Sequence, residues 1–285
     1  MSLALNKDNY FLAENTALSS TKIKDFLRSK EMFYRRYVLG TEKVEQSPSI
    51  LIGRLLDRII EQMTMHYFNR SYKRAVKKKD NPTEYDLQKE WDPEKILSPA
   101  IYDAVVGMAE KMLRAPFLEF YQKRSYKKFK QIILQFPYKE IPICGMLDRL
   151  TIVGRTAYID DLKTSSVGKM QTPESWYYHC LHFGYFIQLA VYKWLVEQTT
   201  SDIDEVICRH IVIGTSKFDA YPIKLYRIPN SLLEEPLQLF FKTAEAISVE
   251  KEWKDTLLDW DDIEEIPESL ATSLQPQIVE DDEAF

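Results

Sequence analysis

The chain has 285 residues, of which 45% are hydrophobic and 28% charged, so it can bury a substantial core. Its formal net charge of −5 excludes a strongly basic overall field, and any contact with a polyanion must come from local basic clusters. Its three cysteines, Cys144, Cys180 and Cys208, are odd in number and widely separated, which argues against a disulfide framework and a zinc site.

The first residues lack the apolar core of a signal peptide, and no run of about 18 apolar residues occurs anywhere. We therefore expect a soluble, cytoplasmic protein. Residues 1–262 are expected to form one domain with a helical N-terminal part. Residues 263–285 are rich in acidic residues and show little periodicity, so we expect a disordered tail.

Two helices are predicted near the N-terminus. Ser19, Ser20 and Thr21 can cap the first, in which apolar residues recur at helical spacing as far as Phe33. The second runs from Ile50 to Tyr67 and contains Asp57. That carboxylate could ligate a metal or pair with a neighbouring arginine on the surface, and Glu61, one turn on, is a weaker candidate.

Two basic clusters follow, at residues 70–79 and 123–130, and a helix beginning at Ser98 separates them. The second cluster leads directly into the predicted strands, and its members are Lys123, Arg124, Lys127, Lys128 and Lys130. Such clusters are often solvated loops, but they can also track a phosphate backbone.

Three consecutive strands are predicted at 131–138, 143–153 and 158–164, with Gly154 able to take positive φ in the second turn. Because side chains alternate along a strand, Asp161 and Lys163 should share one face while Asp160 and Leu162 point the other way.

The second and third strands carry Asp148 and Asp161, whose carboxylates repel each other unless a cation lies between them. Hard oxygen ligands suit Mg²⁺ or Mn²⁺. A nearby lysine, here Lys163, can orient or deprotonate a water, and together these groups suit phosphodiester hydrolysis. A bare Asp-x-Lys pattern is also compatible with an ordinary surface ion pair.

Beyond the strands, one long helix is expected from Thr172 to about Glu197, with Gln188 and Tyr192 on one face. Two further strands, 206–214 and 220–228, should extend the sheet, and a final helix should run from Ser231 to about Trp253. His179 and His182 lack metal-ligand spacing and are interpreted as incidental.

Three ordered motifs stand out: Gly145-Met146-Leu147-Asp148-Arg149, Asp161-Leu162-Lys163-Thr164, and Gln188 with Tyr192 four residues later. Together they resemble the core of the PD-(D/E)XK nuclease superfamily, in its RecB-like and RecE-like exonuclease branch. The resemblance covers roughly residues 19–192. It implies an α/β protein with a three-layer α/β/α restriction-endonuclease-like core, a mixed central sheet and extra N-terminal helices.

The same resemblance assigns roles to the motif residues. Asp148, Asp161 and the backbone carbonyl of Leu162 would bind metal, Lys163 would activate water, and Gln188 and Tyr192 would line the site. Asp57 stands where many members have a metal-binding histidine, so its role is open. Some relatives carry a four-cysteine iron–sulfur cluster, for which this chain has too few cysteines.

The resemblance therefore implies a Mg²⁺-dependent exodeoxyribonuclease, with Mn²⁺ as a substitute, that resects linear duplex DNA from a free end in phage or prophage recombination or repair. A recombination or single-stranded-DNA-binding protein as partner, and a homo-oligomer, would fit this role. The alternatives are a non-catalytic DNA-binding module with the same fold, and a restriction or CRISPR-type endonuclease on the same core.

Overall fold

The computed structural model describes residues 17–41, 51–56, 104–105, 107–108, 111, 127–215, 222–250 and 279–280. Within these ranges, none of the helices combines the length and the apolar character that crossing a membrane requires. Asp57 and the first basic cluster lie outside the described residues, as do Lys123 and Arg124.

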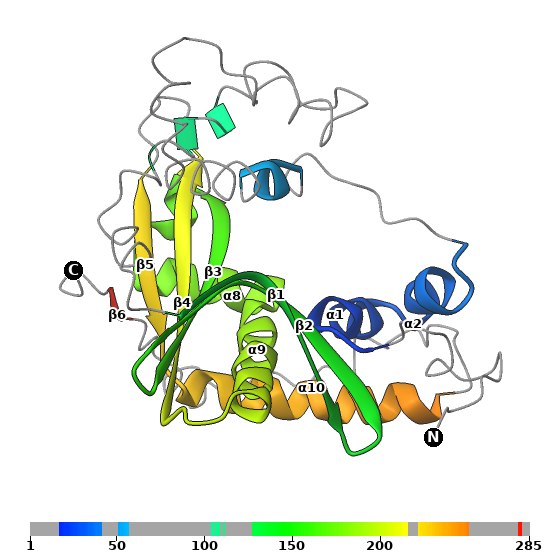
Figure 1. The fold of residues 1–285 in the computed structure, drawn as a ribbon. Coiled ribbons are helices and arrows are strands. Elements are labelled where there is room, and N and C mark those ends of the chain that lie inside the picture. Colours follow the sequence, from blue (N-terminus) through cyan, green and yellow to red (C-terminus); the bar gives the residue numbers. More distant parts are fainter. Residues whose placement is uncertain are drawn as a thin grey trace, which may run out of the picture.

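A mixed sheet of six strands forms the centre of the described fold (Figure 1). Its strands are β1 (Lys127–Tyr138), β2 (Ile141–Val153), β3 (Thr156–Ser166), β4 (Glu205–Thr215), β5 (Ile223–Ile228) and β6 (Val279–Glu280), and they lie side by side in chain order. The β3–β4 pair is parallel and all other pairs are antiparallel. The three-stranded meander predicted from the sequence is confirmed, and Gly154 has a φ of 59°.

The strand β6 comprises two residues of the segment 263–285, which the sequence predicts to be a disordered tail. Val279 and Glu280 pair with Arg227 and Tyr226 of β5. Val279 follows Ile278, so two β-branched residues precede the acidic run that begins at Glu280, and the outer edge of β5 offers Val279 backbone partners.

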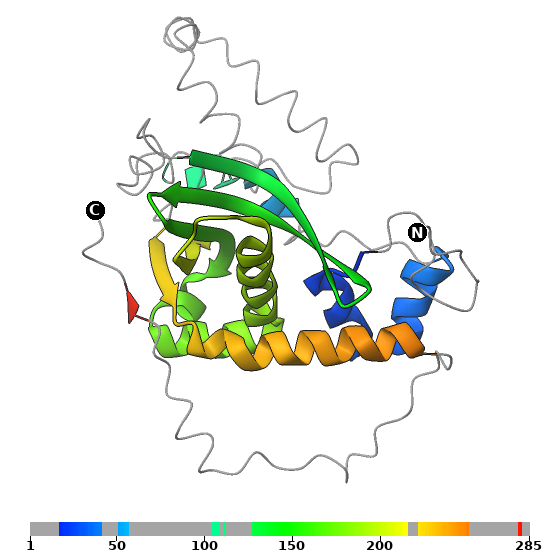
Figure 2. The ribbon, with the colours of Figure 1, turned by 60° about the horizontal axis from the view of Figure 1, so that its bottom comes forward.

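Helices cover one face of the sheet. They are α1 (Ser20–Arg28), α8 (Pro173–Phe183), α9 (Tyr185–Thr199) and α10 (Ser231–Val249); α2 (Lys30–Phe33) and the π-helical turn η2 (Tyr34–Val38) follow α1. In Figures 1 and 2 the curved β1–β2 hairpin arches over α9, while α10 runs beneath it. The short helical segments at 51–56, 104–105 and 107–108 lie on the side of this hairpin away from α10, so helices flank the sheet.

The single long helix expected from Thr172 to Glu197 is wrong, because the chain breaks at Gly184. This residue adopts φ 63° and ψ 34°, and its N–H donates to the carbonyls of Cys180 and Leu181, which ends α8. A left-handed glycine after the last turn is a common helix C-terminus. Thr172 caps α8 and Ser19 caps α1, as predicted.

Two apolar clusters hold the helices to the sheet. One joins α8 and α9 to β2–β5 and contains the fully buried Trp176, stacked on Tyr226 at 5.8 Å. The other joins α1, α9 and α10 to the beginning of β2 through Phe26, Phe240 and Ile143. Burial of each such side chain contributes on the order of 1.5–3 kcal/mol.

The segment before α1 is joined to β2 by backbone hydrogen bonds. Leu18 forms a parallel bridge with Ile143: its N–H donates to the carbonyl of Pro142 at 2.8 Å, and its carbonyl accepts from the N–H of Cys144 at 2.9 Å. This contact fixes α1 next to α9, beside the strand that carries Asp148.

Candidate active site

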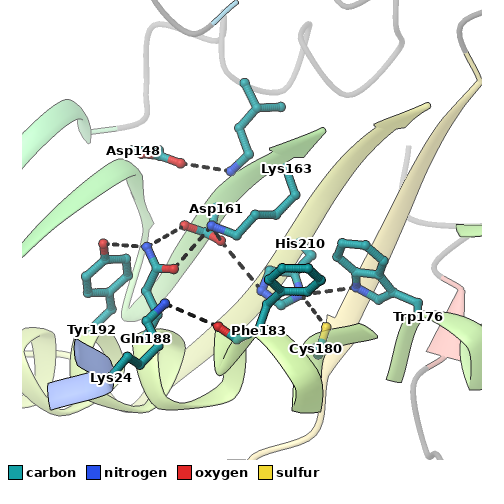
Figure 3. A network of polar contacts seen from close by, with 11 residues as sticks. Lys24, Asp148, Asp161, Lys163, Trp176, Cys180, Phe183, Gln188, Tyr192 and His210 are labelled. Carbon is teal, nitrogen blue, oxygen red and sulfur yellow. Dashed lines mark hydrogen bonds and ion pairs between the residues drawn. The ribbon is translucent and has the colours of Figure 1, made fainter. Parts of the chain in front are cut away.

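The site lies where β2 and β3 part. Their antiparallel register runs from Val153 opposite Thr156 to Arg149 opposite Asp160, and ends there. Beyond this point a side chain, not the backbone of β2, contacts β3. The Asp148 Oδ2 accepts a hydrogen bond from the backbone N–H of Leu162 at 2.9 Å (Figure 3). The side chain of one motif is thereby held against the backbone of the other.

Asp161, Lys163 and Gln188 form one polar network on the face of the sheet covered by α9 (Figure 3). Lys163 Nζ lies 2.5 Å from Asp161 Oδ2 and 3.2 Å from Gln188 Oε1. Gln188 Nε2 donates to Asp161 Oδ1 at 3.3 Å and to the Tyr192 hydroxyl at 2.8 Å. Gln188 and Tyr192 therefore position the aspartate and the lysine, as two residues one helical turn apart can do.

The charge of Lys163 is set by opposing influences. Burial lowers its pKa, but the nearby carboxylates of Asp161 and Asp148 outweigh burial, so the pKa of Lys163 is raised above its ordinary value. Its ammonium also lies 4.7 Å from the centre of the Tyr185 ring, a cation–π contact. Lys163 is therefore an ammonium at neutral pH.

Asp160 faces away from the site, as the strand alternation predicts. Its carboxylate receives two hydrogen bonds from the Arg209 guanidinium of β4, at 2.7 and 3.1 Å, and both residues are buried. Burial raises the pKa of Asp160 despite this pairing. Only one of the two adjacent aspartates is thus available to Lys163.

Sequence reasoning missed His210, which lies opposite Asp161 in the parallel register of β3 and β4. Its Nε2 is 3.6 Å from Asp161 Oδ2, and its Nδ1 accepts a hydrogen bond from the indole N–H of Trp176 at 3.2 Å. Burial lowers the pKa of His210 to about 3, so the imidazole is neutral. A histidine inside an apolar strand gave no signal without the register.

Lys24 was also missed, because its approach depends on how α1 docks. Its Nζ donates to the carbonyl of Phe183 at 3.3 Å and lies 5.9 Å from the Tyr185 ring centre. Burial lowers the pKa of Lys24, and the charge of Lys163 lowers it further. Among the described residues no carboxylate lies within ion-pair distance of this ammonium.

Gly145, the first residue of the first motif, is required by packing. A Cβ built on it would lie 2.9 Å from Leu195 Cδ1 and 2.9 Å from two ring carbons of Tyr192. Only glycine lets β2 approach α9 so closely. The glycine of one motif and the tyrosine of another are therefore in direct contact.

The donor set fits a hard divalent cation, although the described residues contain no cluster of three or more His, Cys, Asp or Glu side chains around one point. Two carboxylates are present, and Asp161 Oδ2 is buried with the Lys163 ammonium beside it at 2.5 Å, an ion pair, as its nearest polar neighbour. Mg²⁺ is commonly bound through one or two carboxylates plus waters and phosphates. Asp57, the remaining candidate ligand, lies outside the described residues.

The second basic cluster is only partly described. Lys127, Lys128 and Lys130 belong to β1 rather than to a loop before it, and they pair in register with Ile152, Thr151 and Arg149. The cluster therefore continues into the strand next to the one that carries Asp148.

Comparisons with known proteins agree with this geometry. A family model described as "PD-(D/E)XK nuclease superfamily" matches residues 17–265. A crystal structure named "Putative exonuclease", from Eubacterium rectale, is 17% identical, with a TM-score of 0.58; the match covers 86% of this chain and 87% of that one, and shows a shared fold.

A second solved structure, named SSO0001, is 15% identical over 68% of this chain and 83% of its own, with a TM-score of 0.28. That score is too low to carry an argument. No match was found among curated proteins.

Proposed function

The chain belongs to the PD-(D/E)XK nuclease superfamily, and from that premise we propose that it is a metal-dependent exonuclease acting on DNA. The observation that carries the proposal is the hydrogen bond from the Leu162 N–H to Asp148. It brings the acid of the first motif to the strand that holds Asp161 and Lys163, which is the arrangement that metal-assisted phosphodiester hydrolysis needs.

Asp148 and Asp161 are the proposed metal ligands, together with the carbonyl of Leu162. In an extended strand the N–H and C=O of one residue point to the same side, so this carbonyl faces the same gap as the Leu162 N–H. A divalent ion held there would supply charge neutralisation on the phosphate and activation of a water.

Lys163 is proposed to orient the attacking water and to contact the phosphate. Sequence reasoning left open whether it orients or deprotonates the water; its position 2.5 Å from Asp161 Oδ2, one of the proposed metal-binding oxygens, suits either role. Gln188 fixes the lysine and Asp161 relative to each other through one amide group. Tyr192 in turn holds that amide.

A polyanionic substrate is supported by Lys24. Burial lowers the pKa of Lys24, the nearby Lys163 ammonium lowers it further, and the carboxylates of Asp161 and Asp25 only partly oppose this. Bringing like charges together costs free energy, and a phosphate between them would recover it. The basic cluster that continues into β1 could hold the backbone farther from the scissile bond, without reading bases.

We further propose that cleavage starts from a free end of the DNA. A nuclease core that holds the DNA backbone through lysines, without reading bases, gains selectivity from how DNA reaches the site. The structural neighbour named as an exonuclease agrees with this reading. We place the activity in resection of linear duplex DNA during phage-type recombination or repair, with Mg²⁺ as the ion.

The test compares linear, nicked and covalently closed circular duplexes in Mg²⁺, with the Lys163→Ala variant as control. We expect release of mononucleotides or short oligonucleotides from linear DNA, and no cutting of closed circles. Activity should fall steeply with added salt. Discrete fragments from closed circles would establish an endonuclease, and salt-sensitive binding without degradation would establish an inert module.

A further inference from the structure

Three buried side chains form a line that ends at the candidate metal-binding aspartate (Figure 3). They are Trp176 of α8, His210 of β4 and Asp161 of β3, with exposures of 0, 0 and 1%. The indole Nε1 lies 3.2 Å from His210 Nδ1, and His210 Nε2 lies 3.6 Å from Asp161 Oδ2. These side chains are inaccessible to bulk solvent, so protein groups determine which atoms along the line donate and which accept hydrogen bonds.

The tryptophan determines which nitrogen of His210 carries the proton. An indole N–H can only donate, so Nδ1 must accept and cannot itself be protonated. A neutral imidazole then carries its proton on Nε2. That N–H points toward Asp161 Oδ2. His210 Nε2 is buried with no hydrogen-bond partner, and Asp161 Oδ2 is buried with the Lys163 ammonium as its other polar neighbour.

We infer that His210 is a positioning residue for Asp161, and that Trp176 sets its tautomer. Gln188 holds one oxygen of the aspartate, at 3.3 Å from Oδ1, and the His210 N–H faces the other. The present distance of 3.6 Å exceeds that of a hydrogen bond, about 2.7–3.2 Å, and the inference requires the two groups to close to that range when a metal binds. The role of Asp161 as a metal ligand rests on the proposed function; the tautomer does not.

Asp161 already pairs with one cation, the Lys163 ammonium, 2.5 Å from its Oδ2. The amide of Gln188 and the imidazole of His210 are neutral, so they orient Asp161 without adding further positive charge beside a bound divalent cation.

The same arrangement excludes His210 as a metal ligand while Trp176 is in place. A ligating imidazole must offer a lone pair, and the lone pair of His210 lies on Nδ1, where the indole N–H occupies it. His210 therefore does not substitute for the histidine that Asp57 replaces.

The first test is nitrogen NMR of the metal-free protein. Wild type should show His210 protonated on Nε2 only, and Trp176→Phe, which keeps a ring but loses the donor, should shift the proton partly to Nδ1. Cys180→Ala is the matched control, because the Cys180 sulfur lies 3.6 Å from the same Nδ1; it should leave the tautomer unchanged. A wild-type proton on Nδ1 would overturn the inference.

The second test is calorimetric titration with Mn²⁺. Trp176→Phe and His210→Leu should each weaken binding about 10-fold or more, as losses of groups that orient metal ligands do. His210→Gln, which keeps an N–H donor, should recover most of the affinity, and Cys180→Ala should bind like wild type. Equal affinity of the Gln and Leu variants, at matched thermal stability, would refute the positioning role.

Failure of the two proposals can be told apart. If wild type binds no Mn²⁺ and cleaves no DNA, the metal-dependent nuclease is wrong and the positioning role falls with it, whereas the NMR result on the tautomer stands. If wild type binds Mn²⁺ and the variants bind it equally well, only the role of His210 is wrong.

Discussion

Replacing Gly145 by alanine should damage stability and activity together, because this glycine lies between the first motif and the helix that carries Tyr192. The added Cβ would lie 2.9 Å from two ring carbons of Tyr192 and from Leu195 Cδ1, about 0.5 Å short of the closest ordinary contact of 3.4 Å. Both neighbours are buried, and the contacts belong to a ring and a branched side chain, so α9 or β2 must move.

The magnitude follows from two opposing effects. Overpacking of a buried site costs about 1–3 kcal/mol, and three contacts this short place Gly145→Ala at the upper end. Alanine also lowers the entropy of the unfolded chain, which returns about 0.4–1 kcal/mol. We expect a net loss of about 2 kcal/mol, and a lower melting temperature by about 4 °C or more.

The matched control is Gly168→Ala in the turn η4 (Val167–Met170), where an added Cβ meets no atom within 4 Å. Urea unfolding of both variants, and cleavage of linear duplex DNA well below the transition, give the two readouts. Displacement of Tyr192 should also disturb the Gln188 amide, so Gly145→Ala should cleave more slowly than Gly168→Ala. Equal stability and equal activity of the two variants would show that β2 can move away from α9 without cost.

Lys163→Ala should abolish cleavage while Mn²⁺ binding, measured by calorimetry, is kept, because the carboxylates hold the ion; residual cleavage near the wild-type rate would remove the lysine from the mechanism. Asp57→Asn should weaken the Mg²⁺ dependence of cleavage about 10-fold or more if Asp57 is a ligand, and unchanged dependence would indicate a surface ion pair. Arg209→Met leaves the buried Asp160 carboxylate without its arginine partner and should lower the free energy of unfolding by about 3–5 kcal/mol. Arg227→Met, which breaks an exposed pair with Glu205, should cost less than about 1 kcal/mol in the same urea titration, and similar losses for the two arginines would contradict the assigned burial.

The strands and the faces of their side chains could be predicted from the sequence because alternation is a local property. Asp161 and Lys163 do share a face, and Asp160 does point away, toward Arg209. The break at Gly184 was not predicted, because a single glycine between Phe183 and Tyr185 leaves the apolar helical pattern intact. Gly184 adopts a left-handed conformation at the C-terminus of α8, and only the backbone geometry reveals it.

The parts of the site that were missed come from tertiary structure. His210 reaches Asp161 only because β3 and β4 are parallel and in that register, with α8 and α9 as the connection between them. Lys24 reaches the site only because α1 docks beside α9. Neither arrangement leaves a periodic signal in the sequence. The division at residue 262 stays a prediction, since residues 251–278 lie outside the described part of the chain.

The bridge between Leu18 and Ile143 also bears on self-association. The first half of β2 is not paired with β3, so its backbone N–H and C=O groups on that side need another partner. Among the described residues, Leu18 is that partner. Unpaired strand edges recruit strands from other molecules. A chain that lacks residues 1–20 would therefore be prone to edge-to-edge aggregation, and the Leu18 bridge protects the intact chain against it.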